Sequence, residues 1–205
     1  MSFFVSKFRK GLTNIGRSLT GKTSNKSLSS SEIEELLIDI RGLRIFISYR
    51  RTDSQNICGR IYDRLMSAPN RYFSVFKDVD AIPIGTDFRH SIESSIQKSD
   101  VLLVIIGNRW TSTISSNHTD STVSSEDFVR IEIELAIKYG IPIIPVLVDF
   151  ATMPKVTELP QSIAELSYRT AILVRPDPDF SNDMEKLMRQ LDAMANTKHQ
   201  ILRIE

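Results

Sequence analysis

Two glutamates stand two positions apart in residues 126–139, where apolar side chains recur with the period of a helix. Glu132 falls inside the apolar sector of this predicted helix. Glu134 instead has basic residues, Arg130 and Lys138, four positions to either side, which is the spacing of a solvated salt bridge. A carboxylate among apolar groups must be paired, protonated or functional. Glu132 is therefore a candidate functional acid, with a structural ion pair to a nearby arginine as the alternative.

Three familiar signatures of enzyme chemistry are missing. No GxGxxG stretch occurs, so the usual dinucleotide-binding turn is excluded, and no GxSxG nucleophile turn is present. The three histidines, His90, His118 and His199, lack the spacing of zinc ligands. We expect neither a metal site nor a bound cofactor.

The elements that must position Glu132 follow an alternating pattern. Short apolar runs predict strands over 43–49, 73–77, 101–106, 141–148 and 171–174. Helical periodicity predicts helices over 54–66, 87–98, 126–139 and from 182 onward, with a looser helical stretch over 160–166. This alternation predicts an α/β fold with a flavodoxin-like parallel five-stranded sheet, strand order 2-1-3-4-5, and helices on both faces. Its ligand crevice would lie at the carboxyl ends of strands 1 and 3.

Several side chains are expected at that crevice. Tyr49, Arg50 and Arg51 leave the first strand, where aromatic and guanidinium groups can stack on a base or bind pyrophosphate. The alternative for the arginines is a basic surface turn. Trp110 follows the third strand, as either a pocket wall or a cap on the core.

The composition is that of an ordinary globular protein. The 205 residues are 41% hydrophobic and 25% charged, enough for one domain with a short appendage. Its single cysteine, Cys58, cannot form an internal disulfide. The longest apolar run covers 101–106, far below the roughly 20 residues of a membrane-spanning helix. We expect a cytoplasmic protein.

Charge is distributed unevenly along the chain. Residues 1–26 contain six of the 26 lysines and arginines and none of the 25 acids, so the remainder carries a net charge of −5. Apolar residues recur with helical spacing here, so residues 1–20 could lie as an amphipathic helix on an anionic membrane surface. A frayed helix without a membrane role and an organelle transit peptide are the alternatives. The acidic remainder makes nucleic acid an improbable partner.

The chain divides into four segments. The basic amphipathic arm (1–26) is followed by a Ser-rich linker and short helix (27–40), the main domain (41–180), and a C-terminal helix (181–205) packed on that domain or extending it.

Three motifs together resemble the Toll/interleukin receptor (TIR) domain family, in its bacterial NAD-consuming branch. Residues 44–51 (RIFISYRR) are similar to the family's first strand, and residues 73–85 (FSVFKDVDAIPIG) to its second strand and following loop. Residues 128–136 (FVRIEIELA) are similar to its W-C-x-x-E-L-x-x-A segment. The resemblance covers residues 43–174, and the three motifs occur in the expected order and spacing.

This resemblance implies that Glu132 is the catalytic glutamate of an NAD⁺ glycohydrolase. Phe128 stands where the family has Trp and keeps an aromatic wall without the indole N–H, and Val129 replaces the usual Cys. NAD⁺ would be the substrate, cleaved at the bond between nicotinamide and ribose to ADP-ribose or a cyclic product. In the loop, Asp80 and Gly85 would contribute to substrate binding, and the loop itself would be a lid and an assembly surface.

The resemblance also implies partners and leaves alternatives open. Other TIR domains would assemble with the chain as a homo-oligomer or filament in bacterial anti-phage signalling. A non-catalytic TIR adaptor, or an effector that subverts host immunity through TIR–TIR contacts, is one alternative. A different N-glycosidase on the same fold, similar to a nucleoside deoxyribosyltransferase, is another.

Overall fold

The computed structural model describes residues 29, 42–69, 73–77, 88–111 and 125–204. The predicted basic arm, nearly all of the linker with its short helix, and the loop that contains Asp80 and Gly85 lie outside the described residues.

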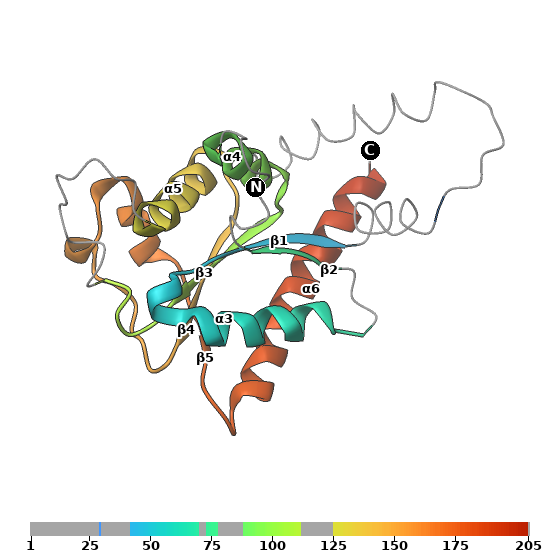
Figure 1. The fold of residues 1–205 in the computed structure, drawn as a ribbon. Helices are drawn as coiled ribbons and strands as arrows, with labels where there is room; N and C mark the ends of the chain where they lie inside the picture. The colour runs from blue at the N-terminus through green and yellow to red at the C-terminus, as the bar shows by residue number, and fades with distance from the viewer. Residues whose placement is uncertain (1–28, 30–41, 70–72, 78–87, 112–124, 205) are drawn as a thin grey trace.

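A five-stranded parallel sheet forms the centre of the domain (Figure 1). Its strands are β1 (Leu43–Ser48), β2 (Phe73–Lys77), β3 (Val101–Ile106), β4 (Ile143–Val148) and β5 (Ile172–Val174). Their spatial order, β2-β1-β3-β4-β5, confirms the predicted order. All six residues of β3 are buried, as expected for a central strand that is covered on both faces.

Helices cover both faces of the sheet. One face packs against α3 (Arg51–Met66) and α6 (Phe180–Ile204). The other packs against α4 (Phe88–Lys98) and α5 (Ser125–Lys138). The short 3₁₀ helix η3 (Gln161–Tyr168) lies beside α5, and η2 (Val156–Glu158) lies beside η3. Figure 1 shows α4 and α5 on one side of the strands and α3 on the other. None of the helices among the described residues is both long and apolar enough to cross a bilayer.

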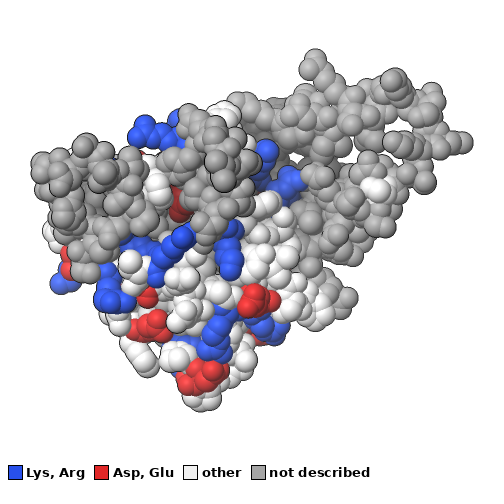
Figure 2. Space-filling model, in the orientation of Figure 1, with Lys and Arg blue, Asp and Glu red and all other residues white. Residues whose placement is uncertain are grey.

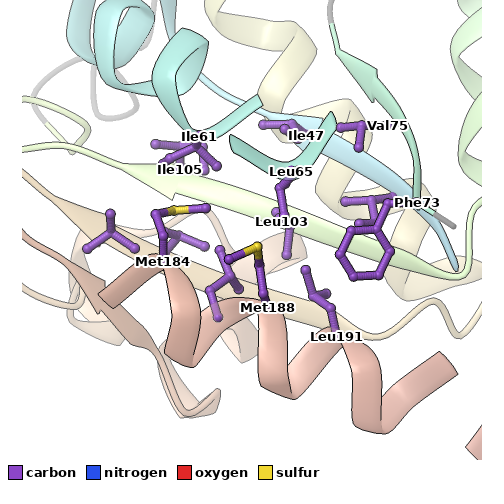
Figure 3. Close-up of a cluster of buried hydrophobic side chains, with 14 of the residues drawn as sticks. Ile47, Ile61, Leu65, Phe73, Val75, Leu103, Ile105, Met184, Met188 and Leu191 are labelled. Atoms are coloured by element: carbon purple, nitrogen blue, oxygen red, sulfur yellow. The ribbon is translucent and has the colours of Figure 1, made fainter. Parts of the chain in front are cut away.

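The two faces have separate hydrophobic cores because side chains alternate along each strand. Leu103 and Ile105 of β3 point to the α3/α6 side, where they meet Ile61 of α3 and Met184 and Met188 of α6 (Figure 3). The next residues along β3 belong to the core under α4 and α5. The α6 helix is thus part of the domain's core.

The first turn of α3 differs from the sequence-based prediction. The helix begins at Arg51, three residues before the predicted start, and Ser54 has non-helical angles (φ −137°, ψ 20°) that interrupt it. The apolar stripe of α3 begins only at Ile57, so periodicity could not reveal a first turn made of polar residues.

Candidate functional site

The end of β1 directs alternate side chains to opposite faces. Ile47 packs in the α3/α6 core and Phe46 in the α4/α5 core. Tyr49 is half-buried against the α3/α6 core, so it lies on the face away from α5. Ser48 is 1% exposed and, by the same alternation, lies on the α5 side.

Arg50 is a buried cation at the carboxyl edge of the sheet. Its side chain is 3% exposed, and its Cζ atom lies 5.5 Å from the centre of the Trp110 ring. Trp110 is completely buried in the α4/α5 core, so it caps this core and also supports the guanidinium by a cation–π contact. Arg51, by contrast, is exposed at the start of α3.

Glu132 is buried on α5, with only 5% of the residue exposed. Its neighbours Val129, Ile133 and Ala136 all pack in the α4/α5 core, and α5 itself packs on β1 and β3. Phe128, one turn earlier on α5, is half-buried. The burial expected from the helical period is therefore confirmed, and Glu132 and Arg50 both border the same core.

Glu134 has a different environment on the same helix. Its Oε1 atom accepts a hydrogen bond of 2.6 Å from the Ser162 hydroxyl, and Arg130 Nε lies 3.5 Å away. The pairing with Arg130 was predicted. Lys138 pairs instead with Glu93 of α4, at 3.1 Å.

Glu93 joins α4 to the end of α5. The Tyr139 hydroxyl donates a hydrogen bond to it, and together with Lys138 lowers the pKa of the Glu93 carboxyl, with Tyr139 as the larger cause. This contact links α4 to the C-terminal end of α5.

Among the described residues, the buried charged side chains are Arg50, Glu132, Asp183 and Lys198. Asp183 binds Arg175 and Lys186, and Lys198 forms an ion pair of 2.8 Å with Asp100. Each of these three ion pairs involves a residue of α6. Arg50 and Glu132 are the two that border the α4/α5 core, and Arg50 follows β1 at the carboxyl edge of the sheet, where folds of this class bind ligands.

Ser48 is a candidate that the sequence analysis did not identify. Among the described residues its buried Oγ atom has no hydrogen-bond partner, a state that costs about 1–3 kcal/mol. A ligand at the edge of the sheet could satisfy it. The sequence contained a signal for it, because Ser48 lies two residues after Phe46 and two before Arg50, the spacing that places side chains on the same face of a strand.

A phosphate-loop pattern, GxxxxGK[ST], also escaped the sequence analysis. It occurs at residues 16–23 (GRSLTGKT), in the basic arm and outside the described residues. In P-loop proteins the pattern follows a strand of a βα unit. The preceding residues have helical rather than strand periodicity, so we assign no nucleotide site to it.

The site can bind and stabilise opposite charges. A buried carboxylate stabilises a developing cation strongly because little water screens it, and a buried guanidinium binds phosphate oxygens with paired hydrogen bonds. Within the described ranges, no cluster of three or more His, Cys, Asp or Glu side chains could hold a metal. Basic and acidic side chains lie among one another on the described part of the face in Figure 2, which therefore presents no continuous basic surface.

Comparisons with known proteins agree with this architecture. Residues 45–191 match the family model of the TIR domain. Among solved structures, the TIR domains of the activated Roq1 resistosome recognising the pathogen effector XopQ are 14% identical, with a TM-score of 0.54. A prokaryotic SEFIR domain is 18% identical, with a TM-score of 0.51. Each comparison covers 73% of this chain and 99% of the other. A search of curated protein sequences found no match.

Proposed function

The chain belongs to the TIR domain family, and from this premise we propose that it is an NAD⁺ glycohydrolase of the bacterial NAD-consuming branch. The observation that carries the proposal is the buried Glu132 carboxylate, on the same side of the sheet as the buried Arg50 guanidinium. A fold that retains two charged groups in a core must balance a large desolvation cost. Binding and cleaving a charged dinucleotide is a function that would maintain them.

The proposed chemistry needs only one acid. Nicotinamide leaves NAD⁺ as a neutral base because the bond to ribose is broken from a cationic pyridinium, so no general acid has to protonate it. The bonding electrons go to the ring nitrogen, and the positive charge develops on the ribose. The Glu132 carboxylate stabilises this oxocarbenium-like sugar and holds its hydroxyls. Water then adds to the anomeric carbon to give ADP-ribose, or a nitrogen of the adenine adds to give a cyclic product.

The other described groups bind substrate in this proposal. Arg50 forms paired hydrogen bonds with the pyrophosphate, since its guanidinium is held over the Trp110 ring. Ser48 donates a hydrogen bond to the substrate from the strand end. Phe128, one turn before Glu132, packs against the departing nicotinamide.

The biological setting that we propose is anti-phage signalling in a bacterial cytoplasm, activated by self-assembly of TIR domains. Support comes from the structural neighbour, whose TIR domains belong to an activated resistosome. Residues 1–20, basic and amphipathic, would attach the assembly to an anionic membrane surface.

A non-catalytic adaptor is the second candidate. It is favoured by exposed apolar side chains near the edge strand β5, where Tyr168 is 78% exposed and Leu173 42%. Such an edge can pair with another chain. In this case TIR–TIR contact would be the function and Glu132 a remnant.

Nicotinamide release tests the proposal. Concentrated protein is incubated with NAD⁺, with and without anionic vesicles, and nicotinamide is followed by chromatography. The wild type and Glu134→Ala should release it at rates within about twofold, whereas Glu132→Ala should be slower by about 10²–10³-fold, the usual cost of a lost electrostatic stabiliser. If the wild type releases no nicotinamide under any of these conditions, the NAD⁺ glycohydrolase proposal is wrong and the non-catalytic adaptor remains. Cleavage of a nucleoside while NAD⁺ stays intact would favour an N-glycosidase similar to a nucleoside deoxyribosyltransferase.

A further inference from the structure

Asp53 joins the start of α3 to the loop that follows β3. Its Oδ2 atom accepts a hydrogen bond of 2.9 Å from the Gly107 backbone N–H, and its Oδ1 atom accepts one of 2.9 Å from the Arg109 N–H. The Arg109 guanidinium in turn donates to the Thr52 carbonyl at 2.6 Å. Three hydrogen bonds thus connect segments more than 50 positions apart in the sequence.

The contact between Asp53 and Gly107 leaves no room for a side chain on the loop. A Cβ atom added at Gly107 would lie 2.4 Å from Asp53 Oδ2, far inside any real contact. A side chain at position 107 would therefore force the Asp53 carboxylate to move, so the observed close approach favours glycine. The interruption of α3 at Ser54 sets the first turn, with Asp53, apart from the rest of the helix.

The same segments carry Arg50 and Trp110. The Arg50 carbonyl accepts hydrogen bonds from the N–H groups of Asp53 (3.1 Å) and Ser54 (2.9 Å). The Trp110 N–H donates to the Gly107 carbonyl at 3.3 Å. Asp53 is therefore bonded on one side to the segment of Arg50 and on the other to the segment of Trp110, whose side chains meet at 5.5 Å.

We propose that Asp53 is a positioning residue for substrate binding. Its carboxylate fixes the loop after β3, so that the Trp110 ring holds the Arg50 guanidinium in the direction of the pyrophosphate. This inference rests on the proposed function. Asp53 does not touch Glu132 in this scheme, so its loss should weaken substrate binding while the chemical step continues.

Four single variants and the double variant Asp53→Ala/Gly107→Ala test the inference. Asp53→Ala removes both acceptors, and Asp53→Asn keeps one carbonyl oxygen while placing an NH₂ group opposite a backbone N–H. Gly107→Ala opens the contact from the loop side through the clash of its Cβ. Asp63→Ala, an exposed acid on the same helix, is the matched control. Circular dichroism confirms that each variant is folded, and nicotinamide release gives kcat and KM for NAD⁺. The fluorescence emission of Trp110, the only tryptophan of the chain, is recorded separately.

The expected result is a change in KM with little change in kcat. Asp53→Ala and Gly107→Ala should each raise KM by about 10–100-fold, the scale of a misplaced binding group, with kcat within about threefold. Both should shift the Trp110 emission to longer wavelength. Asp53→Asn should have a KM between those of the wild type and Asp53→Ala. When Gly107→Ala is added to Asp53→Ala, KM should rise by less than a further factor of about three, because the carboxylate that the new Cβ would meet is already gone.

Other outcomes would overturn the inference in distinguishable ways. An active wild type with unchanged KM in folded Asp53→Ala would overturn the positioning role alone. A lower kcat at an unchanged KM would show that Asp53 only stabilises the fold, so that the variant contains less active protein. An inactive wild type would overturn the proposed function together with this inference.

Discussion

The two faces of the sheet bury charge in different ways. On the α6 face, Asp183 is surrounded by its partners: Arg175 Nε lies 2.7 Å and Lys186 Nζ 2.9 Å from its carboxylate oxygens. Arg175, the larger cause, holds the pKa of Asp183 far below its usual range. On the α5 face, Glu132 and Arg50 are also buried, and Arg50 follows the end of β1, where its guanidinium lies over the Trp110 ring.

Under the proposed function, this difference separates charges that stabilise the fold from charges that bind and cleave the substrate. A buried acid closed within an ion-pair network contributes to folding and needs no ligand. Burying Glu132 and Arg50 also costs desolvation energy, and in the proposed function contacts with the substrate and with the surrounding residues offset this cost. The contrast predicts opposite effects of substitution on the two faces.

The largest effect on stability is expected from Asp183→Asn. Neutralising this carboxylate removes the anion of Lys186 and leaves Arg175 with only the exposed Asp179, so it should lower the free energy of unfolding by about 3 kcal/mol. Activity per folded molecule should not change. Urea unfolding measures the first and nicotinamide release the second. Asp179→Asn, which removes only an exposed partner of Arg175, should cost less than about 1 kcal/mol.

Asp183 also predicts how stability depends on pH. Because its pKa is lower in the folded state than the value of about 3.9 in unfolded chains, its contribution is complete above that value. Below about pH 4 the unfolded state takes up the proton first, so the contribution is lost as pH falls. Unfolding at pH 7, 4 and 3 should show a steeper decline for the wild type than for Asp183→Asn. Parallel curves would contradict this.

On the opposite face, Arg50→Lys should weaken substrate binding by about tenfold in KM. Lysine keeps the charge but loses the planar fork that stacks on Trp110 and binds phosphate with two hydrogen bonds. Arg60→Lys is the control, since Arg60 also lies over an aromatic ring, that of Phe180 at 4.0 Å, but on the α6 face. If KM rose equally in Arg50→Lys and Arg60→Lys, the α5 face could not be distinguished from the α6 face as the one that binds substrate.

The smallest effect should come from two buried serines. Ser48→Ala removes a hydroxyl with no partner among the described residues and should raise stability by up to about 1 kcal/mol, while KM rises a few-fold. Ser99→Ala removes a hydroxyl that donates to the Ser95 carbonyl at 2.8 Å and should lower stability by about 1 kcal/mol. Thermal unfolding compares the two. Destabilisation by both would show that Ser48 is an ordinary core residue.

Much of the fold could be predicted from the sequence because its signals are local. The run 101–106 is apolar throughout, and the structure buries it completely in β3. The sector of α5 that contains Glu132 follows from the helical period, and the pairing of Glu134 with Arg130 follows from a spacing of four. Each of these features depends on residues within two turns or one strand.

The rest depends on contacts that no local pattern encodes. The first turn of α3 is stabilised by Asp53 binding Gly107 and Arg109, more than 50 positions away. The burial of Arg50 depends on Trp110, from a different strand end. Tyr49 was grouped with Arg50 at the crevice, but its side chain packs on the other face because strand alternation separates neighbours.

The most direct test of the account is a pair of measurements on Glu132→Gln. Glutamine keeps the shape of the side chain and one acceptor oxygen, and it replaces the charged carboxylate with a neutral amide. The account predicts that nicotinamide release falls by about 10²–10³-fold while the free energy of unfolding changes by less than about 1 kcal/mol. A variant that loses about as much stability as Asp183→Asn, yet cleaves NAD⁺ at the wild-type rate per folded molecule, would contradict it and make Glu132 a structural acid.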